Sequence, residues 1–169
     1  MTFTTRAALV AGFALLAGPA LAQSSEADYA KRFDGSFSGG GKVRTSAESS
    51  PWNVKCKITG RSTATTVNLD GSCTAAVVAT RKIGASLTIS PNGTYSGTYT
   101  GSKIGPARIS GKRRGDTVVL QVTWPKEVNG DTKATMTITN RGNGFTFAVD
   151  DLDKPGGNTV RVTDISLSK

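Results

Sequence analysis

Apolar and polar residues alternate along most of the chain after residue 35. This period of two places every second side chain on the same face of a β-strand. The apolar members of the clearest runs are Trp52, Val54, Cys56 and Ile58; Ile83, Ala85, Leu87 and Ile89; Val118, Leu120, Val122 and Trp124; and Phe145, Phe147 and Val149. Turn signals rich in Gly, Asn, Asp and Pro separate the runs at intervals of about 8 to 12 residues, as in sandwiches and barrels.

The alternation changes phase near the carboxyl end, where Val160 and Val162 do not match Ile165 and Leu167. A change of phase predicts a β-bulge near residues 163–164. The runs amount to about 8–10 strands, and their short connections favour antiparallel neighbours in sequence order. A meander of this length can close and so remove its edge strands. We expect an all-β, antiparallel up-and-down barrel. A β-sandwich stays open as the alternative, because strand count does not decide closure.

The amino terminus does not follow the alternation. It contains a positive charge at Arg6, an apolar run over residues 7–16 and a small-x-small site that ends at Ala22, the three parts of a secretory signal. The apolar run has about half the roughly 20 residues that a membrane span needs. We therefore expect cleavage after Ala22 and export to the periplasm or the medium. Residues 23–34 would form an arm or short helix, and residues 35–169 a single domain.

Export changes the interpretation of the two cysteines, Cys56 and Cys73. In an oxidising compartment an isolated pair most simply forms a structural disulfide. If the two flanking segments form a hairpin, the cysteines can lie opposite each other on its inward face. A crosslink between strands that are not neighbours is the alternative.

The chain is basic, with a formal net charge of +9 at pH 7. This excess either serves solubility or indicates an anionic partner such as an acidic polysaccharide, a lipid headgroup or a cell-wall polymer. Export argues against nucleic acid. The densest basic stretch contains Arg108, Lys112, Arg113 and Arg114, which are candidate anion-binding residues. The alternative is that charged turns here prevent edge pairing.

Several inferred inward positions carry small residues: Gly39, Gly41, Gly97, Gly101, Ala107 and Gly111. Small inner residues either leave room for a ligand or allow strands to coil and pack closely. If there is a cavity, its natural lining is aromatic, because aromatic side chains supply apolar area with a few polar groups. The candidate ligand-binding residues are Phe37, Trp52, Tyr95, Tyr99 and Trp124.

Catalytic signals are weak. The chain contains no histidine, which removes Ser-His-Asp and Cys-His catalysis, a His-ligated haem and the commonest zinc sites. It also lacks the Ser-x-x-Lys and Gly-x-Ser-x-Gly motifs. The acidic loop with Asp150, Asp151, Asp153 and Asn158 could hold calcium, but it does not match EF-hand spacing. We expect no enzyme activity, cofactor or metal.

The segment from Phe33 to Gly39 resembles the opening of lipocalin-type (calycin) barrels, in which Gly-x-Trp begins the first strand. Phe37 stands where the tryptophan would be. Lipocalins usually carry a late arginine that packs on this tryptophan. Arg161 is the candidate, although its strand phase points outward. The segments 124–126 and 129–131 are similar to those of exported proteins from soil and root-associated bacteria, and this resemblance implies no activity.

Together these observations predict a non-enzymatic binding protein of the cell envelope. Its partner would be a small apolar or amphipathic ligand inside the barrel, or an anionic envelope surface. The alternative is a secreted barrel that resembles protease inhibitors or mediates protein interaction. In that case the working part would be the arm, residues 23–34, rather than the interior.

Overall fold

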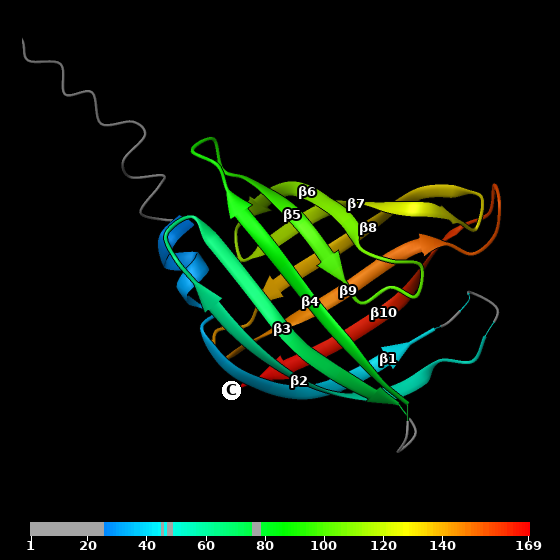
Figure 1. Cartoon of the computed structure of the whole chain (residues 1–169), viewed down its shortest axis with the longest axis horizontal. Helices are drawn as coiled ribbons and strands as arrows, with labels where there is room; N and C mark the ends of the chain where they lie inside the picture. Colours follow the sequence, from blue (N-terminus) through cyan, green and yellow to red (C-terminus); the bar gives the residue numbers. More distant parts are fainter. Residues whose placement is uncertain (1–25, 45, 47–48, 76–78) are drawn as a thin grey trace, which may run out of the picture.

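The computed structural model describes residues 26–44, 46, 49–75 and 79–169, and it forms one closed antiparallel β-barrel (Figure 1). The strands are β1 Gly35–Val43, β2 Trp52–Ser62, β3 Thr66–Ala75, β4 Ala79–Ile89, β5 Thr94–Thr100, β6 Ala107–Arg114, β7 Thr117–Val128, β8 Asp131–Asn140, β9 Gly144–Leu152 and β10 Thr159–Ser168. Each strand pairs with its neighbours in sequence, and β1 also pairs with β10. The up-and-down barrel is confirmed, and the sandwich alternative is not what forms. The expected signal, residues 1–22, lies outside the described residues.

The alternation of the sequence becomes the two faces of the barrel wall. On β2, for example, Val54 and Cys56 are buried and Lys55 and Lys57 are exposed. The expected bulge is present on β10, between Arg161 and Thr163, slightly before the expected position. The extra residue restores the phase, so that the apolar residues on both sides of the bulge can face inward.

The disulfide is confirmed. Cys56 on β2 and Cys73 on β3 are direct partners in the strand register and are bonded to each other. Both are at least nine-tenths buried. The bond links residues 17 apart in sequence, and closing a loop of this size stabilises the folded chain by about 3 kcal/mol in the chain-entropy model.

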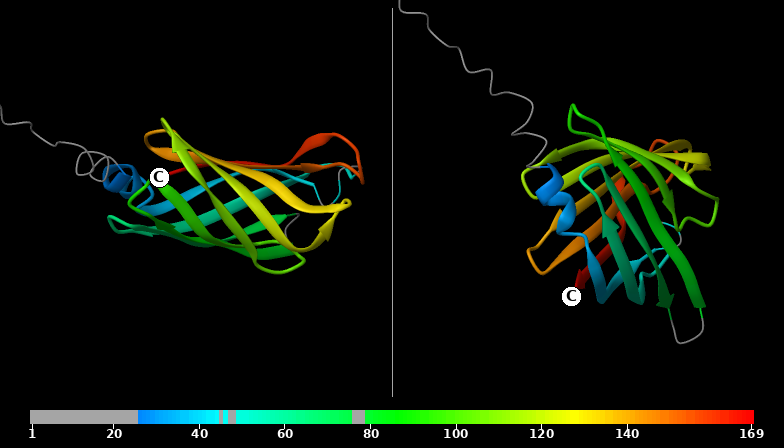
Figure 2. Two further views of the ribbon diagram at one scale, coloured as in Figure 1. Left: turned by 90° about the horizontal axis from the view of Figure 1, so that it is seen from above. Right: turned by 60° about the vertical axis from the view of Figure 1, so that its left-hand side comes forward.

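One end of the barrel, which we call the closed end, is covered by a helix over residues 26–31 (Figure 2). Tyr29 and Phe33 of this arm are 2% and 3% exposed. Phe33 and Phe37 each pack edge-to-face on Phe145, with ring centroids 5.4 and 5.0 Å apart. In the described part of the chain no helix has the length and apolar character needed to cross a membrane. The arm is therefore the apolar plug of one barrel end.

The inward glycines have a structural reason. A Cβ atom on Gly97 would lie 1.8 Å from the carbonyl oxygen of Ser86, and one on Gly111 would lie 1.9 Å from that of Val119. At these positions the neighbouring backbone occupies the space that a side chain would need. Of the two explanations that the sequence left open, close strand approach accounts for these glycines, and room for a ligand does not.

Candidate functional site

The opposite end of the barrel, which we call the mouth, is the end at which β1, β3, β5, β7 and β9 finish and β2, β4, β6, β8 and β10 begin (Figure 1). The five aromatic residues expected to line a cavity are divided between the two ends. Phe37 and Tyr95 are buried at the closed end. Tyr99 and Trp124 lie at the mouth, with ring centroids 6.4 Å apart, and Trp52 begins β2 at the mouth and is 48% exposed.

The barrel interior contains a cavity of about 30 Å³ with an entirely apolar lining. Its inner wall includes Met136 and Ile138, which are fully buried. Among its lining residues, Ile83, Tyr99 and Phe147 have side chains that are only partly buried. A volume of this size holds about one water molecule, whereas ligand pockets usually measure about 300–1,000 Å³. A ligand can therefore enter the interior only if these three side chains move.

A cation stands beside this partly buried wall. Arg81 is the partner of buried Cys73 in the β3–β4 register and is in phase with Ile83, but at this end of β4 its side chain is exposed. Burial raises the pKa of Tyr99 to about 12, and the charge of Arg81 opposes that rise. Within the described residues neither of these two side chains donates or accepts a side-chain hydrogen bond, and Arg81 forms no ion pair. Its inward phase was visible in the sequence, two residues before Ile83.

The other side of the mouth is held by Trp124 and Asp151. Asp151 is 4% exposed and accepts hydrogen bonds from Nε1 of Trp124, at 2.9 Å, and from the backbone N–H of Leu152, at 2.8 Å. Burial raises the pKa of Asp151, and the two hydrogen bonds offset part of that effect. Tyr99 therefore packs against a tryptophan whose orientation is fixed.

In the acidic loop considered for calcium, the carboxylates bind different partners and do not converge on one point. Asp150 binds the Nε and Nη2 atoms of Arg161 at 2.8 and 2.9 Å. Asp153 accepts a hydrogen bond from the backbone N–H of Asn158 at 2.8 Å. Across the described residues no three His, Cys, Asp or Glu side chains gather in a metal-binding group.

Arg161 also bears on the lipocalin resemblance. It lies on the outer surface with Asp150 and does not reach Phe37. A cation from the carboxyl end of the chain nevertheless covers Phe37, because Nζ of Lys169 lies 5.3 Å from the centre of that ring.

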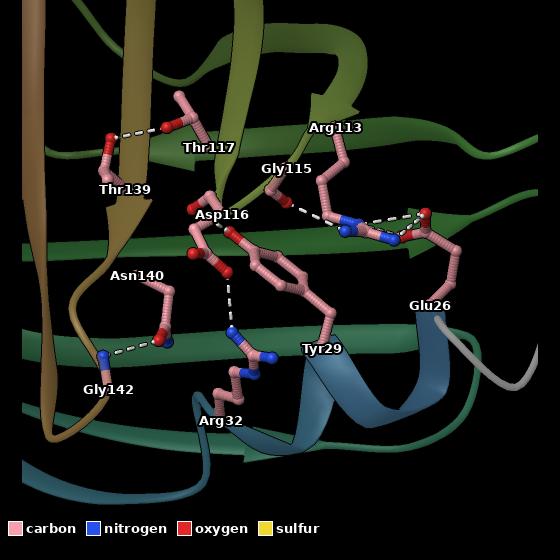
Figure 3. A network of polar contacts seen from close by, with 10 residues as sticks. All are labelled: Glu26, Tyr29, Arg32, Arg113, Gly115, Asp116, Thr117, Thr139, Asn140 and Gly142. Atoms are coloured by element: carbon pink, nitrogen blue, oxygen red, sulfur yellow. Dashed lines mark hydrogen bonds and ion pairs between the residues drawn. The ribbon is translucent and has the colours of Figure 1, made fainter.

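The four residues expected to form an anion site do not act together. Arg108, Lys112 and Arg114 point outward from β6, and Arg113 points to the opposite face. The guanidinium of Arg113 contacts the carboxylate of Glu26 in the arm, with Nε and Nη2 at 3.0 and 2.9 Å (Figure 3). Sequence reasoning missed Glu26, because nothing local shows that the arm folds back onto β6.

Two tyrosines complete this closed-end network. The hydroxyl of Tyr95 donates to Glu26. The hydroxyl of Tyr29 donates to the backbone carbonyl of Asp116 at 3.0 Å (Figure 3). Arg113 lies over the Tyr29 ring, 4.9 Å from its centre. Burial is the main cause that raises the pKa of both tyrosines. The arm is thus joined to the barrel by polar contacts as well as by its apolar plug.

Next to this network lies a groove of about 330 Å³, between the arm and the β2–β3 and β4–β5 turns. Its charged lining residues are Glu26, Lys112 and Arg113. Glu26 and Arg113 neutralise each other, which leaves Lys112 as the one charge of the lining without an ion pair among the described residues. The groove thus offers a single cation, without the aromatic and apolar wall of the mouth.

Comparison with known proteins adds one finding. No protein-family model and no curated protein matches the chain. Among solved structures, the barrel is similar to the crystal structure of Rv2717c from M. tuberculosis, with a TM-score of 0.64 and 10% sequence identity. The match covers 82% of this chain and 92% of the other. The likeness is one of fold. It carries no activity across.

Proposed function

We propose that this chain is an exported, non-enzymatic binding protein whose mouth binds a small amphipathic anion. The observation that carries the proposal is Arg81, a cation in the inward phase of the barrel wall that has no ion pair among the described residues. It stands beside the hydroxyl of Tyr99 and an apolar interior. A few polar groups at the edge of an apolar site are what orient a small ligand.

The acidic group of the ligand would bind Arg81, whose planar guanidinium can donate two parallel hydrogen bonds to a carboxylate. The Tyr99 hydroxyl would donate a third. The apolar part would lie against Ile83 and Phe147 and extend toward the cavity. A ligand with both features satisfies the charge at the mouth and the apolar wall behind it. A purely apolar ligand would leave Arg81 unpaired.

Entry requires the small cavity to grow. Ile83, Tyr99 and Phe147 are the side chains able to move at least cost, because they are only partly buried and the other side chains of the lining are buried more deeply. Trp124 stays fixed by Asp151, so the proposed opening lies on the β4–β5 side of the mouth. Binding should therefore perturb Tyr99 more than Trp124.

Export is supported by the disulfide, since a paired cysteine couple of this kind persists in oxidising compartments. The protease-inhibitor alternative is favoured less, because Tyr29 and Phe33 of the arm are buried in the protein's own barrel. Mass spectrometry of the exported protein should show Gln23 as its first residue.

The test uses cis-parinaric acid, a fluorescent fatty acid, as the probe. The wild-type protein should bind it, and Arg81→Gln should weaken binding about tenfold or more, the loss expected when one charge-assisted contact is removed. Lys82→Gln is the matched control, because Lys82 is the next residue on β4 and points outward. It should bind the probe as the wild type does.

The methyl ester of the probe separates charge from apolar contact. It should bind the wild type about as weakly as the acid binds the Arg81→Gln variant. Equal binding of the acid by the wild type and by Arg81→Gln would overturn the proposal.

A further inference from the structure

The positive charge of the chain is concentrated in one part of the sequence. Residues 35–114, which contain β1 to β6, hold 12 of the 21 Lys and Arg and two of the 12 Asp and Glu. Residues 115–169, which contain β7 to β10, hold six Lys and Arg and seven Asp and Glu. Because β1 to β6 are consecutive neighbours in the barrel, this division along the chain is also a division in space. The basic charge covers one side of the molecule.

The outward positions of β1 to β6 carry eight exposed cations and one carboxylate, Asp70. We call these cations the cationic face: Lys42, Lys55, Lys57, Arg61, Lys82, Arg108, Lys112 and Arg114. None of them belongs to an ion pair within the described residues. On β10, by contrast, Arg161 is bound to Asp150.

The centre of the face has a fixed geometry. Lys57, Ser72 and Lys82 lie in one row across β2, β3 and β4. Lys55 and Lys57 flank Cys56, whose disulfide to β3 lies directly beneath them. Like charges held this close repel each other, so the arrangement lowers the stability of the free protein and favours an anionic partner.

The ordinary explanations do not account for this segregation. Charged residues protect exposed strand edges, but a closed barrel has no edges. Solubility is served as well by charges of both signs distributed over the whole surface. Neither explanation requires the carboxylates to be concentrated on the other side.

We infer that the cationic face binds a linear acidic polysaccharide. The cations lie on β1, β2, β4 and β6, within an arc of six neighbouring strands, so a flat bilayer can reach only a few of them, whereas a flexible polymer can follow the curved wall. A bilayer contact would also favour apolar side chains among the cations. The exposed large apolar residues that the structure describes, Trp52 and Val119, lie instead at the mouth end of β2 and on β7.

The residue types favour the same partner. Five of the eight cations are lysines, which act as flexible point charges and suit a diffuse polyanion better than a single bidentate site. Single-stranded nucleic acid is bound on aromatic stacking platforms, and the outward positions of β1 to β6 contain none. This inference does not depend on the mouth, because Arg81 is not part of the face.

The test measures binding of polygalacturonate to the full exported chain at several salt concentrations. The affinity should fall steeply as salt rises, because the contact is electrostatic. The triple variant Lys55→Gln, Lys57→Gln and Lys82→Gln should weaken binding about tenfold or more at low salt. It should still bind cis-parinaric acid at the mouth, which keeps this test separate from that of the proposed function.

The matched control removes the same charge from the other side of the barrel, with Lys126→Gln, Lys133→Gln and Lys154→Gln. These lysines are also exposed, and this variant should bind polygalacturonate nearly as the wild type does. An equal loss in both triple variants would show a net-charge effect only and would overturn the inference. Tighter binding to vesicles of anionic phospholipid or to single-stranded DNA than to polygalacturonate would overturn the choice of partner. Thermal unfolding of both variants checks that the barrel is intact.

Discussion

Arg81 on β4 and Asp151 on β9 show how the partners of a charged side chain determine its role. Both occupy the inward phase near the mouth, but Asp151 is bonded to Trp124 and buried, whereas Arg81 is exposed and has no such partner among the described residues. A buried carboxylate with two donors is part of the framework. A cation of the inward phase without a counter-ion is available for an anionic ligand. We therefore assign Asp151 a structural role and Arg81 a role in the proposed ligand site.

Asp151 gives a prediction with a defined sign. Because burial raises its pKa in the folded protein above the ordinary 3.8, the folded state holds the proton more tightly than the unfolded state. Its contribution to the free energy of unfolding should therefore fall as the pH rises through that raised pKa. In a Trp52→Phe background, the fluorescence of Trp124 should titrate with a midpoint above 3.8. The same background with Asp151→Asn should lack this transition, and a midpoint at or below 3.8 would contradict the account.

At the scale of elements, the strands and the arm differ in how far the sequence specifies them. The strands follow from alternation, because each residue's environment depends on its immediate neighbours. The bulge on β10 was visible for the same reason, as a change of phase that predicted it near residues 163–164, slightly after its observed position between Arg161 and Thr163. The arm was not, since its place depends on Arg113 and Tyr95, which are far from it in sequence. Long-range contacts of this kind leave no local pattern.

The arm gives the second prediction. Glu26 and Arg113 are 17% and 19% exposed in their side chains, and the change Glu26→Gln would remove the ion pair between them. We expect the free energy of unfolding to fall by about 2 kcal/mol, the range for a hydrogen-bonded charged group. Asp150→Asn is the control, since its partner Arg161 is half exposed and the loss should be less than about 1 kcal/mol. Urea unfolding measures both. Similar losses in the two variants would show that the arm is not held by this contact.

At the scale of the whole molecule, the meander topology relates the order of residues in the sequence to their positions on the barrel surface. Since neighbours in sequence are neighbours in the barrel, the basic part of the chain becomes the basic side of the barrel. Closure was expected from the number of strands and their short connections. The sequence left open whether the interior is filled or hollow, because this depends on how side chains from ten strands fit together. The expected aromatic lining was likewise divided between the two ends, because alternation gives the face of each residue but not its height in the barrel.

Met136 offers the most direct test of ligand entry at the mouth. It is fully buried on the cavity wall, and it is the only methionine other than Met1, which belongs to the expected signal. The exported protein labelled with ¹³C at its methionine methyl group should therefore give one NMR signal. Titration with dodecanoate should shift that signal until it saturates, and Arg81→Gln should need about ten times more dodecanoate or still more for the same shift. Dodecanoate binding that calorimetry detects but that leaves the Met136 signal unmoved would contradict the account.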